Sequence, residues 1–125
     1  MGVEFSGLAP IYYQIIMKIC GRIVRGELQP GDKLPSVREL ATQYGVNPNT
    51  VQRVYLELER LSLSEARRGQ GTFVTEDRGR LLQLREQLRQ DRIGTFLDDM
   101  REMGFTDREI ADGLRPYLAL AGEAE

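Results

Sequence analysis

Apolar residues recur at helical spacing in the middle of the chain. From residue 51 onward they stand three and four positions apart, which places them on one face of a helix that we expect to begin at Pro48. Asn47 is a good N-cap for this helix, and a proline at the first helical position loses no hydrogen bond. The predicted buried stripe comprises Val51, Val54, Tyr55, Leu58 and Leu61.

The other side of this helix is polar near its amino end. Four polar residues lie off the apolar stripe there, namely Asn49, Thr50, Gln52 and Arg53. Asparagine and glutamine can pair with adenine edges, arginine with guanine, and threonine with a phosphate, so this mix suits a helix that reads the DNA major groove. A polar helix face is by itself more often only solvated, so the interpretation depends on the neighbouring elements.

A shorter helix is predicted directly before it, over about Val37 to Tyr44. Ser36 and Glu39 have the spacing of a capping box, and Gly45 supplies a left-handed end. The apolar face comprises Val37, Leu40, Ala41 and Tyr44. The short link between the two helices fits a helix-turn-helix. Arg38 lies off the apolar face, and we interpret it as a DNA contact, with a plain surface arginine as the alternative.

A basic, glycine-rich hairpin is predicted after the second helix. The run Arg67-Arg68-Gly69-Gln70-Gly71 lies between short strands expected near Leu63 to Ala66 and at Thr72 to Val74. Glycine lets the backbone approach phosphates closely, and arginine is attracted by the negative potential of the minor groove. The helix pair and this hairpin together predict a winged helix-turn-helix with duplex DNA as its partner.

The preceding residues are interpreted as scaffold. Pro10 is expected to open a helix that ends at Gly26. Its apolar face comprises Ile11, Ile15, Ile16, Ile19 and Ile23. Tyr12 and Tyr13 are interpreted as ordinary packing residues. Lys33 and Leu34 are expected to form a short strand that pairs with the wing.

The chain changes character after Val74. A polar hinge covers residues 76–80, and a long helical pattern then runs from Leu81 until Gly104. Thr106 and Glu109 form a second predicted capping box, which starts a final helix. A helical hairpin of about 45 residues cannot bury both of its apolar stripes, so we expect it to pack on a second subunit. The predicted dimerisation residues are Leu84, Leu88, Phe96, Leu97, Met100, Ile110, Leu114 and Tyr117.

The predicted fold is mainly α with a small β-wing: a winged helix-turn-helix followed by a two-helix antiparallel dimerisation hairpin. Residues 1–75 form the DNA-binding domain and residues 76–125 the appendage. The whole chain has a net charge of −2, but the charge is uneven. The first part carries nine basic against seven acidic residues, and the second carries eight against twelve. The positive charge therefore accompanies the predicted DNA-binding motif.

Composition excludes several other functions. No apolar run is long enough for a membrane span or a signal peptide, so we expect a cytoplasmic protein. Cys20 is the single cysteine and histidine is absent, which excludes an internal disulfide and a zinc cluster. With no phosphate-cradling motif either, we expect neither an enzyme nor a cofactor. A module that uses the helix-turn-helix to contact another protein is the remaining alternative.

Three blocks resemble the DNA-binding domain of GntR-family bacterial transcription regulators. They are residues 31–41, 47–55 and 68–74, in the family's order and spacing. The chain departs from the family's pattern at Pro48, where arginine is common, and at Leu61-Ser62, where Glu-Gly is usual. The resemblance implies a homodimer on a palindromic operator, interpreted as a repressor, and DNA contacts at Arg38, Asn49, Thr50, Gln52, Arg53, Arg68 and Gly69.

The tail is similar to the two-helix appendage of the short-tailed YtrA-like subgroup, whose members dimerise through it. A hairpin of this size offers no enclosed ligand cavity, so an unidentified small-molecule effector would have to bind at the dimer or interdomain interface. The complete set of predicted DNA contacts is Ser36, Arg38, Asn47, Asn49, Thr50, Gln52, Arg53, Arg67, Arg68, Gly69, Gln70 and Gly71.

Overall fold

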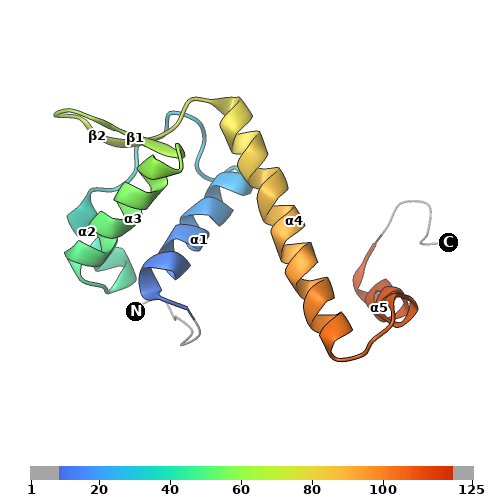
Figure 1. Cartoon of the computed structure of the whole chain (residues 1–125). Helices are drawn as coiled ribbons and strands as arrows, with labels where there is room; N and C mark the ends of the chain where they lie inside the picture. The colour runs from blue at the N-terminus through green and yellow to red at the C-terminus, as the bar shows by residue number, and fades with distance from the viewer. Residues whose placement is uncertain (1–8, 120–125) are drawn as a thin grey trace. The chain divides into compact units, whose positions relative to one another are not determined.

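The computed structural model describes residues 9–119, and this part of the chain is mainly helical (Figure 1). The elements are α1 (Ile11–Val24), α2 (Val37–Tyr44), α3 (Pro48–Arg60), β1 (Ser64–Arg67), β2 (Gly71–Val74), α4 (Arg78–Glu102), α5 (Asp107–Leu114) and the 3-10 turn η1 (Arg115–Tyr117). They divide between two compact units, Met1–Arg85 and Glu86–Glu125. The predicted fold class, mainly α with a small β-wing, is confirmed: a winged helix-turn-helix is followed by a long and a short helix.

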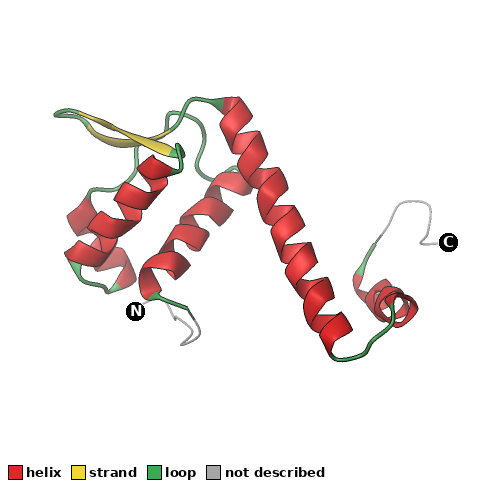
Figure 2. Ribbon diagram, viewed as in Figure 1, coloured by secondary structure: helices red, strands yellow, loops and turns green. Residues whose placement is uncertain are grey.

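The core of the first unit is built around α3: α1 and α2 both pack against it, and the wing lies at its carboxyl end (Figure 2). Its most deeply buried large side chains are Ile15, Ile19, Leu40, Val51, Val54, Leu58, Leu63 and Val74. Ile11 was expected on the same face but is 46% exposed, because it lies in the first turn of α1, at the edge of the core. Cys20 is buried, and burial raises the pKa of its thiol to about 11.

The helix-turn-helix has the predicted caps. The Ser36 hydroxyl accepts a hydrogen bond from the Glu39 N–H at 3.1 Å, and the Glu39 carboxylate accepts one from the Ser36 N–H at 2.8 Å. Gly45 ends α2 in the left-handed conformation, with φ 67°. The Asn47 side-chain oxygen accepts from the Asn49 N–H at 2.7 Å and starts α3 at Pro48. These caps fix both ends of the link between the helices.

The wing is a two-stranded antiparallel hairpin with Arg67 opposite Gly71. The first strand extends to Arg67, so the turn itself is shorter than predicted and comprises Arg68, Gly69 and Gln70. Lys33 forms a bridge with Phe73, and the Leu34 N–H donates to the Thr72 carbonyl at 2.8 Å. The predicted pairing of this segment with the wing is therefore confirmed, as a single bridge.

Ser62, just after α3, adopts a left-handed conformation with φ 60°. It occupies the position where a helix commonly ends on glycine, and a side chain is strained there. We expect Ser62→Gly to raise the free energy of unfolding by about 0.5–1 kcal/mol, the relieved strain minus the greater flexibility of unfolded glycine. Urea unfolding measures this change. As a control, Thr42→Gly inside α2 should lower stability, and a loss of stability in Ser62→Gly would contradict the expectation.

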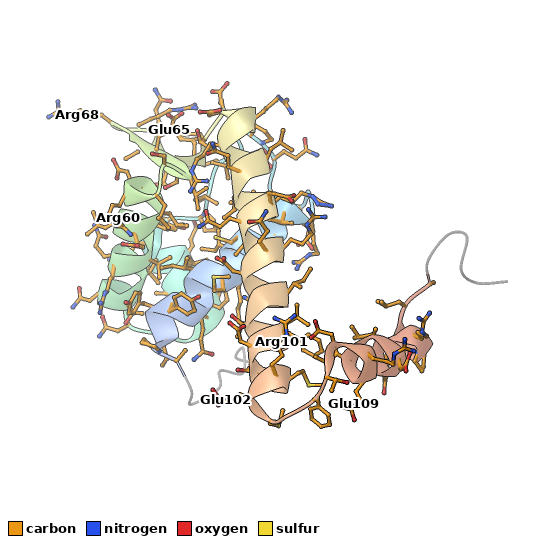
Figure 3. All side chains as sticks on the ribbon, turned by 45° about the vertical axis from the view of Figure 1, so that its right-hand side comes forward. Arg60, Glu65, Arg68, Arg101, Glu102 and Glu109 are labelled. Atoms are coloured by element: carbon orange, nitrogen blue, oxygen red, sulfur yellow. The ribbon has the colours of Figure 1, made fainter. Side chains whose placement is uncertain are left out.

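The second unit contains the end of α4 and all of α5. Gly104, with φ 91°, ends α4 as predicted, and Thr106 and Glu109 form the predicted capping box. α5 extends away from the end of α4 instead of returning alongside it (Figures 1 and 3), so the expected packing of an antiparallel hairpin is not formed. The short link and an ion pair between Arg101 and Asp107, at 3.0 Å, hold the start of α5 at this end.

The last predicted helix is shorter than expected. α5 ends at Leu114, and Tyr117 lies in a 3-10 turn with 84% of its surface exposed. Pro116 accounts for this ending, because its nitrogen has no hydrogen to donate and its ring clashes with the preceding helical turn. Within residues 9–119 the structure contains no helix long and apolar enough to cross a membrane.

Candidate nucleic-acid interface

The polar amino-terminal half of α3 faces outward, as predicted. Val51 and Val54 are fully buried, whereas Asn49, Gln52 and Arg53 are exposed. Thr50 is half-buried. The three exposed side chains belong to the first two turns of the helix, which is the part that contacts base edges in a helix-turn-helix protein. Asparagine, glutamine and arginine can each form two hydrogen bonds to a base edge.

Ser36 and Asn47 are already engaged in capping their helices. In each residue the side-chain oxygen accepts a backbone hydrogen bond, so what remains for DNA is the Ser36 O–H and the Asn47 amide N–H groups. Hydrogen bonds from the Ser36 backbone and side chain lower the pKa of Glu39. Glu39 therefore keeps its negative charge to a lower pH than a free glutamate, and it follows the predicted contact Arg38 in the sequence. Arg38 itself is exposed, in the first turn of α2.

The two arginines of the wing differ in their surroundings. Arg67 forms ion pairs with Glu76 at 2.9 Å and Glu65 at 3.1 Å, and its guanidinium lies 4.1 Å from the ring centroid of Phe73. Arg68 is exposed and extends from the wing tip (Figure 3). Neighbouring carboxylates thus compensate the charge of Arg67, whereas Arg68 presents its charge at the tip.

This difference predicts unequal effects of two substitutions. Arg68→Ala should reduce the salt dependence of DNA binding by about one unit of slope, because one phosphate contact is lost. Arg67→Ala should change the slope less, because Glu65 and Glu76 already neutralise its charge. Fluorescence anisotropy with a labelled duplex over a salt series measures both slopes. Equal losses from the two variants would contradict the distinction.

The other residues of the wing tip are held by backbone geometry. Gly69 and Gly71 have positive φ values of 75° and 120°. A Cβ on Gly71 would lie only 3.0 Å from Cε of Lys33, so the glycine also leaves room for that side chain. Gln70 and Lys33 line a groove of about 350 Å3 between the wing and the start of α2. Lys33 was predicted to pair with the wing, but it was not among the predicted DNA contacts.

Tyr12 also lies at this surface, although it was not predicted as a DNA-binding residue. Tyr12, in the first turn of α1, lies beneath Arg53 of α3, with 3.7 Å between the guanidinium carbon and the centroid of the ring. The two residues are far apart in the sequence, and no spacing rule connects them. The interpretation of Tyr12 as an ordinary packing residue therefore missed this contact.

The predicted dimerisation residues differ in how much of their surface is free. Leu84 and Ile110 are already buried within the single chain, at 7% and 4% exposure. Leu88, Leu97, Met100 and Leu114 are half-buried. Phe96 and Tyr117 are exposed, and so are the unpredicted residues Ile93 and Met103. An apolar surface thus remains on the second unit, although its exposed members differ in part from the predicted set.

A capped helix pair, a polar outward face on the second helix and a basic wing define a winged helix-turn-helix DNA-binding protein. The family model "Bacterial regulatory proteins, gntR family" matches residues 11–74. The chain belongs to this family of DNA-binding transcription regulators. The family consists of regulators and not enzymes, as predicted.

Two relatives from Bacillus subtilis (strain 168) are similar to the chain. The uncharacterized HTH-type transcriptional regulator YhcF is 47% identical over 117 residues, which are 94% of this chain and 97% of YhcF. The HTH-type transcriptional repressor YtrA is 47% identical over 87 residues, which are 65% of this chain and 67% of YtrA. The predicted resemblance to short members of the GntR family is confirmed.

Solved structures agree with this assignment. A GntR family transcriptional regulator from Listeria monocytogenes has a TM-score of 0.84 and 39% identity, covering 90% of this chain and 98% of its own. The DNA-binding domain of AraR, solved in complex with operator ORX1, has a TM-score of 0.54 and 29% identity. That likeness covers 60% of this chain and 95% of the AraR domain.

Proposed function

We propose that the chain is a homodimeric repressor that reads a palindromic operator with one α3 helix per subunit. The proposal rests on the outward polar face of α3 together with the exposed wing arginine Arg68, on the fold of a DNA-binding family. The AraR domain was solved on an operator, and YtrA is a repressor. Both relatives support operator binding and repression for this chain.

Each exposed residue of the surface has a role in this proposal. Asn49 and Gln52 form paired hydrogen bonds with adenine edges, and Arg53 binds the O6 and N7 atoms of guanine. Arg38 and Arg68 bind phosphates on either side and fix the orientation of the domain. Because acidic neighbours compensate the charge of Arg67, few phosphate contacts remain, and base contacts supply a large part of the affinity for the operator.

Dimerisation follows from the size of one module. A single winged helix-turn-helix buries a small DNA interface, which limits its affinity and its discrimination between sites. The exposed apolar residues Ile93, Phe96, Met103 and Tyr117 of the second unit are suited to bury against a second copy. Two copies would then read half-sites whose centres lie roughly 34 to 36 Å apart, in successive major-groove turns.

Selection of bound duplexes from a random pool tests the proposal. The wild-type chain is expected to enrich a palindrome with half-sites about one helical turn apart. The variant carrying both Asn49→Ala and Gln52→Ala serves as the control and should enrich no such sequence. A wild-type pool with the same sequence composition as the input would overturn the proposal.

A further inference from the structure

We infer that Tyr12 is a positioning residue for base reading by Arg53, so that the DNA-reading surface includes the start of α1. The inference rests on the proposed function of α3 as the helix that reads base pairs. It adds a residue outside the helix-turn-helix and the wing to the determinants of specificity.

The geometry of the contact leaves the arginine free to bind DNA. The guanidinium carbon of Arg53 lies 3.7 Å from the centroid of the Tyr12 ring, so the cation rests on the face of the ring. A guanidinium carries its five N–H donors in its own plane, and a contact through its flat face does not consume them. The donors therefore remain available for the two acceptors of a guanine edge.

The ring is a fixed support. Tyr12 is half-buried in the first turn of α1, and the same helix packs against α3 through buried side chains that include Ile15 and Ile16. A flexible arginine that rests on such a ring has fewer conformations to lose when it binds a base. The ring thereby orients Arg53 before DNA arrives.

The charge of Arg53 is also little compensated along its own helix. Glu57 lies one turn later, but its carboxylate accepts two hydrogen bonds from Arg60. The bond from Nε of Arg60 is 2.9 Å long. The hydrogen bond from Arg60 is the main reason that the pKa of Glu57 is lowered, and the charge of Arg53 contributes least. Glu57 is thus engaged by Arg60, and Arg53 retains its charge for an acceptor on DNA.

Three substitutions test whether Tyr12 positions Arg53 through its aromatic face or only through its apolar bulk. Tyr12→Phe keeps the aromatic face, whereas Tyr12→Leu keeps apolar bulk and removes the face. Tyr13→Leu is the matched control, because Tyr13 is the next residue of α1 and is 49% exposed. Thermal unfolding of each variant checks the fold. Tyr12→Met replaces the leucine variant if that variant fails to fold.

The test compares base preferences after selection from a random duplex pool. Tyr12→Leu is expected to lower the preference for guanine by roughly three- to fivefold at the one position in each half-site where Arg53→Ala loses it. Tyr12→Phe and Tyr13→Leu should retain the wild-type profile. In the Arg53→Ala background, Tyr12→Leu should cause no further loss, because the residue that it positions is gone.

The outcomes distinguish the inference from the function on which it rests. A wild-type chain without any preferred sequence would overturn the proposed function and the inference together. A wild-type palindrome that Tyr12→Leu reads unchanged would overturn the inference alone. The inference would also be overturned if Tyr12→Leu and Arg53→Ala reduced base preference at different operator positions. Full additivity of the two losses in the double variant would overturn it as well.

Discussion

A Phe96→Asp variant is expected to be monomeric and to bind its operator at least about 100-fold more weakly than the wild-type chain. Phe96 is 39% exposed on the apolar surface of the second unit, and a carboxylate buried there in a dimer would lack a partner. Loss of the dimer separates the two reading helices. In a dimer, binding of one subunit holds the second α3 helix close to the second half-site at a high effective concentration. A monomer loses this advantage.

Sedimentation equilibrium measures the association, and anisotropy measures operator binding. Thr95→Asp is the matched control, because it adds the same charge at the neighbouring exposed position of α4. The control should remain dimeric. A Phe96→Asp chain that still sediments as a dimer would show that α4 pairs through other residues or that another surface joins the subunits.

A Gln52→Ala variant is expected to lose roughly 10- to 100-fold in affinity for the selected operator. Gln52 is exposed in the second turn of α3, and a bidentate contact with a base contributes about 1–3 kcal/mol of discrimination. Binding to unrelated duplex DNA and its salt dependence should not change, because glutamine carries no charge. Competition titrations with specific and unrelated duplexes measure the ratio of the two affinities.

Gln83→Ala provides the control for this variant. Gln83 is an exposed glutamine of α4, outside the predicted contacts, and its removal should leave both affinities as they are. If Gln52→Ala weakened binding to all sequences equally, Gln52 would be acting on the DNA backbone or on the fold. The assignment of α3 as the base-reading element at this position would then be wrong.

Local signals predicted most of the DNA-binding fold. Capping requires particular side chains at particular positions, so Ser36, Asn47 and Gly45 marked the helix ends correctly. The apolar stripe of α3 is one-sided, and it therefore also fixed which residues face outward. The pairing of the Lys33 segment with the wing was also predicted, and the structure forms it as a single bridge.

Features that depend on tertiary contacts were not predictable in the same way. The stack of Arg53 on Tyr12 joins two helices, and the compensation of Arg67 by Glu76 joins the wing to the residues that follow it. The direction of α5 depends on the link and its ion pair, which an apolar stripe does not encode. Ser62 took the left-handed position that glycine commonly occupies, so the end of α3 lacked its usual sequence signal.

The modest net charge of the DNA-binding part is consistent with this arrangement. Several of its arginines have acidic neighbours, as Arg60 has Glu57 and Arg67 has Glu65. The positive charge that remains is concentrated at a few exposed positions such as Arg38 and Arg68. We therefore expect weak binding to DNA of arbitrary sequence and a larger gain on the correct operator.

The spacing of the two half-sites tests whether two linked chains read one operator. Five extra base pairs, inserted between the half-sites of the selected operator, rotate one half-site by about half a helical turn and move it to the opposite face of the duplex. If two linked chains read the two half-sites, the affinity should fall to that of a duplex with a single half-site. An affinity unchanged by the insertion would show that the two half-sites are not read together by linked chains.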